Sequence, residues 1–341
     1  MRIGAPFRAA VCLVFCAFCF VGCGPDSENN ANNEPQASWE TAFDASEEGW
    51  LMSVAGAASD DVYMVGGTPQ RGHIVHFDGA RWQPQQVPES VELLNWVHVF
   101  DDGTPIVAGN GGVILRPDDS AGDGWRAEQT PTDQDLWGVW GASQDDIWAV
   151  GGDGRTEGAA TVVRFQDGEW HEVDLPELER PNVRAFFKIW GTDADNFYIV
   201  GQRGVVLHFD GEELEELHVG TSDDLISLWG TGPDNIVMVG GRSNGVVVHF
   251  DGEDWTAHPQ APIVGLNGVW MDEPGRAFVA GNSGVVGTLD LDNFEVTVEQ
   301  ADTPLTVHAV FGVDGRVFAA GGSLASPQPP HRGVALERGS Q

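Results

Sequence analysis

Basic residues are scarce in this sequence, and lysine is almost absent. Lysine and arginine together number 17 against 52 aspartates and glutamates, the formal net charge is −35, and Lys188 is the lone lysine. A field of this sign repels a polyanion, and the chain has no basic stripe along which a phosphate backbone could bind. The composition therefore excludes nucleic acid as a partner.

Cysteine is missing from all but the N-terminal part of the chain. The four cysteines are Cys12, Cys16, Cys19 and Cys23. If the segment before Cys23 is removed on export, one cysteine is left, and no disulfide framework can form. Stability must then come from a hydrophobic core, which about 300 residues can supply.

The first residues have the layout of a secretory signal. Arg2 and Arg8 precede an apolar run over residues 9–21, which is shorter than the roughly 20 residues of a membrane-spanning helix. The run ends in FVGC, which resembles the bacterial lipobox, with Cys23 as the lipidated residue. Phe20 stands where Leu, Val or Ile is usual.

We therefore expect three parts in the chain. Residues 1–22 are predicted to be a lipoprotein signal peptide, and residues 23–36 a lipidated cysteine followed by a flexible polar tether. Residues 37–341 are predicted to form the folded domain. Because Gly24 rather than an aspartate follows the cysteine, we expect a location in the cell envelope, lipid-anchored at the outer membrane.

The folded part is built from repeats. The stretch LWGVWGASQDDIWAVGG returns as FFKIWGTDADNFYIVG from Phe186 and as LISLWGTGPDNIVMVGG from Leu225. Each unit starts with an alternating strand, and its central apolar residue can be followed through Val54, Val99, Val139, Ile189, Leu228, Val269 and Val310. No helical period competes, and four strands every 40 to 45 residues or so are typical of propeller blades.

Turn residues separate the strands within each unit. An acidic turn follows the first strand, the second strand ends at glycine, and the third strand, such as GVVLHF, is closed by Asp-Gly, a strong hairpin signal. An aromatic or leucine marks the fourth strand: Trp82, Trp125, Trp170, Leu214, Trp255 and Phe294. We expect the aromatic residues to fill the space between blades, where glycines let the backbones approach closely.

The seventh unit stops before its fourth strand. The segment ASWETAFD, residues 37–44, matches fourth strands such as WHEVDLPE and carries Trp39 as its aromatic. The sequence therefore predicts an all-β fold, a seven-bladed β-propeller of four-stranded antiparallel blades whose ring is closed by an N-terminal strand.

Units of the form WGxxxDDxWAVGxxGxxxHFDGxxW resemble those of a group of bacterial envelope lipoproteins with tandem propeller repeats. The resemblance covers nearly the whole chain after the signal and implies the architecture, but no activity. A more distant similarity reaches kelch-type propellers, through paired glycines such as Gly151-Gly152, and Asp-box propellers, through Ser222, Asp224 and Trp229. Neither similarity implies a function here.

The strong catalytic and metal motifs are missing. The sequence has no nucleophile elbow, P-loop, HExxH helix or CxxC pair. His76, His208 and His249 recur at the end of the third strand, but equivalent positions on different blades cannot converge on one ion, so we expect structural roles, no metal and no cofactor. His98 and His308 lie on first strands and are expected to line the channel. Calcium binding by the acidic turns stays open.

The two faces of the predicted propeller differ in charge. The turns between first and second strands, and between third and fourth strands, are rich in aspartate, whereas the loops between second and third strands carry arginine. The candidate ligand-binding residues of these loops are Arg71, Arg155, Arg203, Arg242 and Arg332, together with Asn110 and Asn282. They could form a ring that receives an anionic or sugar ligand, or the arginines could only offset nearby carboxylates.

The sequence favours a non-enzymatic function. We expect a monomeric ligand-binding or protein-interaction module whose partner is a protein or a glycan, in contact with the membrane through its lipid anchor only. The alternative is a carbohydrate-active enzyme, a hydrolase or lyase with its site at the channel mouth. Such an enzyme needs two carboxylates at a defined separation, which a sequence cannot show.

Overall fold

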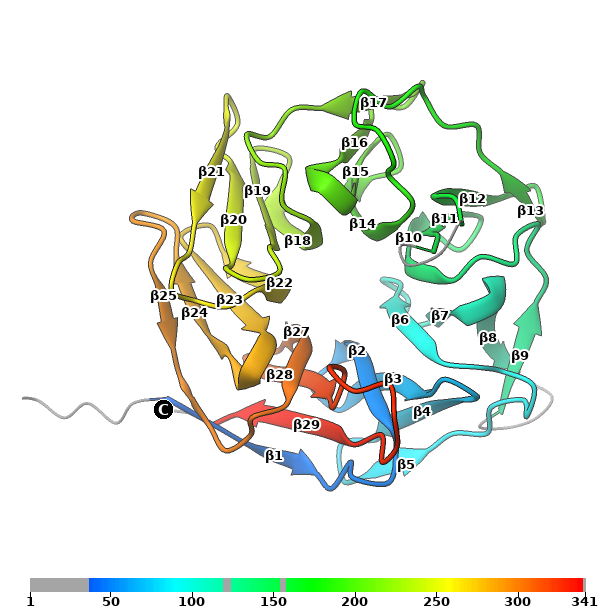
Figure 1. Cartoon of the computed structure of the whole chain (residues 1–341). Helices are drawn as coiled ribbons and strands as arrows, with labels where there is room; N and C mark the ends of the chain where they lie inside the picture. The colour runs from blue at the N-terminus through cyan, green and yellow to red at the C-terminus, as the bar shows by residue number, and fades with distance from the viewer. Residues whose placement is uncertain (1–36, 119–123, 154–157, 340–341) are drawn as a thin grey trace, which may run out of the picture. The chain divides into compact units, whose positions relative to one another are not determined.

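The computed structural model describes residues 37–118, 124–153 and 158–339, which form seven β-sheets around a central axis (Figure 1). The signal, Cys23 and the tether lie outside these residues, so the predictions made for them stay predictions. Each sheet is one blade, as the repeat spacing predicted. Among the described residues no helix is long and apolar enough to cross a membrane.

Six blades are continuous in sequence, with the first strand innermost. Blade 1 contains β2 (Trp50–Ala58), β3 (Asp61–Thr68), β4 (Arg71–Phe77) and β5 (Trp82–Pro84). Blade 2 contains β6 (Leu94–Val99), β7 (Pro105–Gly109), β8 (Ile114–Asp118) and β9 (Gly124–Glu128). Blade 3 contains β10 (Leu136–Ser143), β11 (Asp146–Gly151), β12 (Thr161–Gln166) and β13 (Glu169–Glu172).

The next three blades repeat this order. Blade 4 contains β14 (Phe186–Asp193), β15 (Asn196–Gly201), β16 (Val206–Phe209) and β17 (Leu214–Leu217). Blade 5 contains β18 (Leu225–Gly232), β19 (Asn235–Gly240), β20 (Val246–Phe250) and β21 (Trp255–Pro259). Blade 6 contains β22 (Leu266–Glu273), β23 (Arg276–Gly281), β24 (Val286–Asp290) and β25 (Val296–Val298). Short 3₁₀ turns follow the second strands of blades 2, 4 and 6: η1 (Asn110–Gly112), η2 (Gln202–Gly204) and η3 (Asn282–Gly284).

The seventh blade combines both ends of the described chain. Its first three strands are β27 (Thr306–Val313), β28 (Arg316–Gly322) and β29 (Gly333–Arg338), and its fourth is β1 (Ser38–Phe43), antiparallel to β29. The N-terminal segment thus closes the ring, as the strand count predicted. A two-residue strand, β26 (Gln300–Ala301), adds a parallel pairing on the other side of β1.

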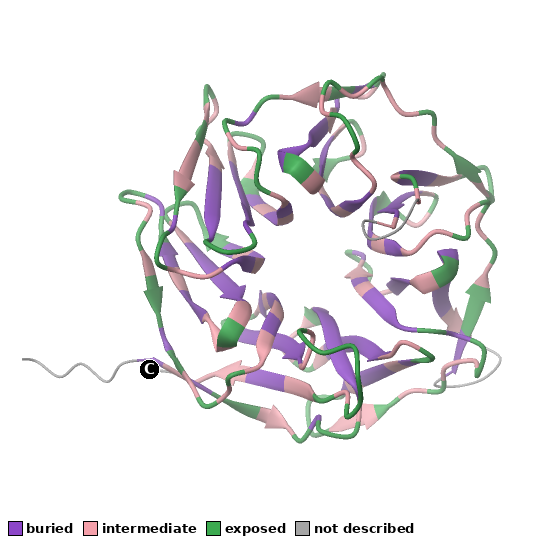
Figure 2. Ribbon diagram, in the orientation of Figure 1, coloured by how far each residue is buried: buried purple, intermediate pink, exposed green. Residues whose placement is uncertain are grey.

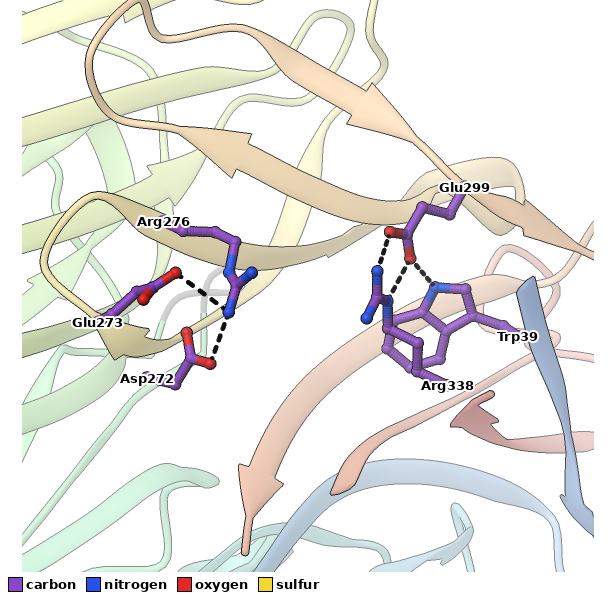
Figure 3. Close-up of polar contacts among 6 residues, drawn as sticks. All are labelled: Trp39, Asp272, Glu273, Arg276, Glu299 and Arg338. Carbon is purple, nitrogen blue, oxygen red and sulfur yellow. Dashed lines mark hydrogen bonds and ion pairs between the residues drawn. The ribbon is translucent and has the colours of Figure 1, made fainter. Parts of the chain in front are cut away.

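A buried polar cluster holds this closure together (Figure 3). Trp39 of β1 donates its indole N–H to Glu299 Oε2 at 2.8 Å. Arg338 of β29 binds both oxygens of the same carboxylate at 2.7 and 2.8 Å. The Glu299 side chain is only 5% exposed, so its charge is stabilised by these donors rather than by water. One glutamate at the end of blade 6 therefore binds both strands that complete blade 7.

The hydrophobic core lies between neighbouring blades. Figure 2 shows buried residues along the inner and middle strands and exposed residues on the outer strands. Between blades 3 and 4, Trp148 contacts Phe197 and Phe209, with ring centroids 4.8 and 5.2 Å apart. Glycine is required where strands come together: a Cβ on Gly151 would overlap the carbonyl oxygen of Asp135. The tryptophans and glycines of the repeat thus have the packing roles expected of them.

Two register predictions were wrong. In blade 2 the residue equivalent to Val139 is Val97, which pairs with Val107 and is 1% exposed, and not Val99, which lies at the strand end. The turn between β6 and β7 begins earlier than in the other blades, so counting from the turn shifts the assignment by two residues. Phe294 does not start the fourth strand of blade 6; it lies in the preceding turn with φ 59°.

Candidate functional site

The predicted arginine ring is only partly assembled. Arg203 and Arg242 both meet Asp224: the Arg203 backbone N–H donates to Oδ1 at 2.8 Å, and the Arg242 guanidinium forms an ion pair with Oδ2. Arg71, the first residue of β4, and Arg332, just before β29, are both exposed. Arg155 lies outside the described residues. The ion pair of Arg242 agrees with the alternative interpretation, in which the loop arginines offset the charge of nearby carboxylates.

The two asparagines proposed as ligand residues are engaged within the fold. Asn110 Oδ1 accepts a hydrogen bond from Asn95 Nδ2 at 2.9 Å. Asn95 Nδ2 also donates to Leu136 O in blade 3. Asn282 Oδ1 accepts from Asn267 Nδ2 at 3.1 Å in the equivalent place. Each asparagine therefore orients a partner that bonds the next blade. This gives Asn110 and Asn282 a structural role that the sequence did not suggest.

The recurring histidines pair with the start of the second strand. His76 meets Asp61 at 2.6 Å, His208 meets Asn196 at 2.8 Å, and His249 meets Asn235 at 2.9 Å. These are cross-strand contacts within single blades, as a structural role requires. No group of three or more His, Cys, Asp or Glu residues in the described part of the chain could hold a metal ion.

The acidic turns use their carboxylates to form the turns themselves. Asp78, Asp210 and Asp251 each accept two backbone N–H groups from the residues that follow, and these bonds lower the pKa of each carboxyl. Asp102 accepts the N–H of Thr104 at 2.9 Å, which lowers its pKa in the same way. Much of the acidic face therefore has a local structural explanation.

The central channel contains an unusual amine. Lys188 on β14 is 3% exposed, and its Nζ lies 3.0 Å from the ring centre of Trp96 on β6, two blades away. Gly138, on the blade between them, leaves room for this crossing. Burial lowers the pKa of Lys188 well below its usual value.

Two channel histidines are held neutral. Burial lowers the pKa of His98 to about 4, and burial together with nearby Lys188 lowers the pKa of His308 to about 4. His98 donates to Gly141 O at 3.2 Å and His308 to Met52 O at 2.8 Å. Each bond links neighbouring blades, so these residues join the inner strands.

A groove of about 610 Å³ lies between the outer strands of blades 3 and 4. Its walls are β13 with the segment after it and the turn from β16 to β17, which belong to neighbouring blades of the ring (Figure 1). The floor is apolar and buried, with Trp148, Phe209 and Leu214 at 3, 7 and 8% exposure. The rim is exposed and contains His171, Glu172, Asp174, Glu212 and Glu213.

The charges of this groove are unbalanced. Its one arginine, Arg164, forms two 2.8 Å hydrogen bonds to Asp146 and so is already neutralised. The four rim carboxylates make no side-chain hydrogen bond or ion pair with the described residues. Trp148 lines the groove, and its buried indole N–H also has no acceptor within the described ranges. The groove thus offers free acceptors at its rim and a free donor in its floor.

A second groove, of about 450 Å³, occupies the equivalent place between blades 7 and 1. Its acids are already engaged: Asp44 binds the Ser46 N–H, Glu48 lies 3.3 Å from His73, and Glu337 is bonded twice by Arg316. The same architecture therefore produces two grooves of different chemistry. Of these two grooves, the blade 3–4 groove is the one whose carboxylates have no partner among the described residues.

The sequence did not identify either groove. Their walls come from neighbouring blades, so residues far apart in the sequence meet only after the ring has formed. The available signal was the density of acids in HEVDLPELE and DGEELEE, which the repeat pattern assigned to outer strands and turns.

Comparisons with known proteins agree with the architecture. No protein-family model matches the chain. Over 162 residues it is 31% identical to the immune protein Tsi7 of Pseudomonas aeruginosa, a match covering 47% of this chain and 46% of Tsi7. The chain therefore spans about half the length of this relative.

Several solved structures share the fold. The WD40 β-propeller domain of Doa1 has a TM-score of 0.67 and 10% identity, over 89% of this chain and 97% of that one. YCF48 bound to D1 peptide has a TM-score of 0.64 and 15% identity, over 89% of this chain and 97% of YCF48. A catalytically inactive virginiamycin B lyase from Staphylococcus aureus, with quinupristin, has a TM-score of 0.69 and 12% identity. The match covers 89% of this chain and 100% of the lyase. At these identities the likeness shows the propeller fold alone.

Proposed function

We propose that this chain is a non-enzymatic protein-interaction module, held at the bacterial cell envelope by a lipid on Cys23. The propeller is a rigid scaffold that presents loops and grooves to a partner. The half-length match to an immune protein supports this proposal, because a propeller can protect a cell by covering the surface of another protein. The large like charge of every copy favours a monomer.

The blade 3–4 groove carries the proposal. It combines a buried aromatic floor with an exposed polar rim, the pattern of a protein-binding hot spot. Its rim carboxylates are free to meet a partner, whereas Arg242 and the two loop asparagines are engaged within the chain. We therefore place the partner at the groove rather than at the arginine loops.

A photo-crosslinking experiment in cells tests this placement. A crosslinking amino acid at Glu213, in the groove, should capture one protein, whereas the same residue at Arg71, on the loop side, should not. The captured protein, once purified, should form a defined complex with the full chain in detergent. Loss of that complex in Arg71→Ser/Arg203→Ser/Arg242→Ser, with Glu212→Gln/Glu213→Gln unaffected, would place the site at the arginine loops instead.

A glycan array run with the same full chain separates the remaining alternatives. We expect no glycan to bind with an affinity comparable to that of the purified protein partner. Specific binding of one glycan, followed by its cleavage, would instead support the carbohydrate-active enzyme.

The anchor has its own test. Cells fed labelled palmitate should label the wild-type chain and the Cys19→Ser control, but not Cys23→Ser. The labelled protein should fractionate with the outer membrane. Equal labelling of all three proteins would remove Cys23 as the attachment point.

A further inference from the structure

We propose that the blade 3–4 groove receives an extended, arginine-containing segment of a protein partner. This inference rests on the proposed function and adds the chemistry of the docking element. It follows from three features of the groove: free carboxylates at the rim, a free donor in the floor, and apolar surface between them.

The rim requires a cation. Glu172 and Asp174 on the blade 3 side face Glu212 and Glu213 on the blade 4 side across one groove. All four are exposed and unpaired within the described residues, and the only other titratable groups in the lining are His171 and the neutralised Arg164. Carboxylates on two walls favour a ligand with more than one positive charge.

The floor requires an acceptor. The Trp148 indole N–H is buried without a partner in the described part of the chain, which is costly in a folded protein. Its ring faces are already covered by Arg164, 4.6 Å from the ring centre, and by Phe197 and Phe209. The N–H is closed off from solvent in the free chain, so a ligand must displace the side chains over it to accept this bond. A peptide carbonyl oxygen can accept this hydrogen bond, whereas a metal ion or a polyamine cannot.

Arginine suits the rim better than lysine. The guanidinium is planar and binds carboxylates with two parallel hydrogen bonds, and its hydrocarbon stem covers apolar surface. Leu175 and Pro176 supply such surface beside the rim acids. A main chain that runs along the floor can accept the Trp148 N–H with a carbonyl oxygen while alternate side chains reach the two walls.

The groove between blades 7 and 1 provides a built-in control. It has the same position in the fold, but it carries Arg81 and Arg316, and its acids are engaged. We therefore expect no binding of a basic segment there. Any general attraction of a cation to this acidic protein would act on both grooves.

The test measures binding of a synthetic peptide to the full chain by calorimetry at low salt. The probe is an acetylated, amidated hexapeptide of sequence Arg-Arg-Ala-Ala-Arg-Arg, whose adjacent arginines point to opposite walls in an extended chain; its controls are the citrulline counterpart and spermine. The arginine peptide should bind at least tenfold more tightly than the citrulline peptide. Glu212→Gln/Glu213→Gln and Glu172→Gln/Asp174→Asn should each weaken it about tenfold, whereas Asp44→Asn/Glu48→Gln should change it less than twofold.

Trp148→Phe tests the donor separately. This variant should bind the peptide about fivefold more weakly and bind spermine as the wild type does. Thermal melting confirms that the variant is folded. Equal affinities for the arginine and citrulline peptides, or equal losses in the two grooves, would overturn the inference. So would identical behaviour of spermine and the peptide towards every variant, because that indicates attraction of any polycation. If the rim and floor variants fail to affect the peptide but abolish the complex with the captured protein, the proposed function survives and only this docking chemistry fails.

Discussion

Closure of the ring can be tested through Trp39. This side chain is 4% exposed, packs in the core between blades 6 and 7, and donates to the buried carboxylate of Glu299. Trp39→Ala removes both the packing and the hydrogen bond, whereas Trp39→Phe keeps most of the packing and removes only the donor. Comparing the two separates the contributions of packing and hydrogen bonding.

The expected losses follow from these contacts. Truncating a buried tryptophan to alanine costs about 3–5 kcal/mol, and a hydrogen bond to a charged group contributes about 1.5–3 kcal/mol. An unfolding entropy of about 2.1 cal/mol/K per residue gives about 0.6 kcal/mol/K for a propeller of this size. Trp39→Ala should then melt about 5–8 °C lower than the wild type, and Trp39→Phe about 2–5 °C lower.

Differential scanning calorimetry gives the measurement, and Trp170, which is partly buried, gives a comparison for the hydrogen bond. Trp170 donates to Glu128 at 3.0 Å, the same kind of contact between blades 2 and 3, where no chain end is involved. Because strand edges are freed only at the closure, Trp39→Ala should lower the melting temperature more than Trp170→Ala. A chain beginning at Gly49 should melt far lower than one beginning at Glu34. Equal melting of those two chains would show that β1 does not close the ring.

Three further predictions concern pH, burial and backbone contact. Because the pKa values of His98 and His308 are lowered to about 4, the unfolded chain binds more protons between pH 4 and 6.5, so the melting temperature should fall as pH is lowered through this window. The loss in the free energy of unfolding is on the order of 3 kcal/mol per histidine. A melting temperature that does not change with pH, or a pH dependence that stays the same after both histidines are changed to asparagine, would contradict this prediction. Lys188→Met should raise the melting temperature at pH 7, since it removes a buried amine and loses only the contact with an aromatic ring, about 0.5–2 kcal/mol; a lower value would show that this contact outweighs burial. Gly151→Ala should destabilise the chain by more than about 2 kcal/mol in urea unfolding, because the new Cβ meets a carbonyl oxygen, whereas Gly232→Ala, with open space around it, should be within about 0.5 kcal/mol of the wild type.

Most of the fold could be predicted because its signals are local. Asp-Gly turns, alternating strands and a regular spacing repeat in nearly every unit, and counting strands identified β1 as the missing piece. Errors arose where one unit departs from that spacing, as at Val99 and Phe294. The repeat could define the average blade, but not the earlier start of the turn in blade 2 or the left-handed backbone of Phe294.

The candidate site could not be predicted in the same way. The groove depends on which acids remain unpaired after folding, and pairing is decided by side chains from neighbouring strands and blades. Asp146 is neutralised by Arg164, whereas the Glu212 side chain has no partner in the part of the chain that the structure describes, although both look like acidic turn residues in the sequence. In the same way, the sequence alone suggests that Glu299 is an exposed charge. In the fold, Trp39 and Arg338 donate hydrogen bonds to its carboxylate.

The position of β1 also determines how the propeller carries mechanical load. In a protein tethered through its N-terminal segment, any pull on the tether reaches β1 before the rest of the sheet. β1 is paired with β29 along one edge and with β26 along the other. A force applied at Ala37 is therefore shared between blade 7 and the end of blade 6, and both ladders must shear before the strand leaves. If the chain is anchored at Cys23 as proposed, the same pairing that closes the ring makes its attachment resistant to extraction.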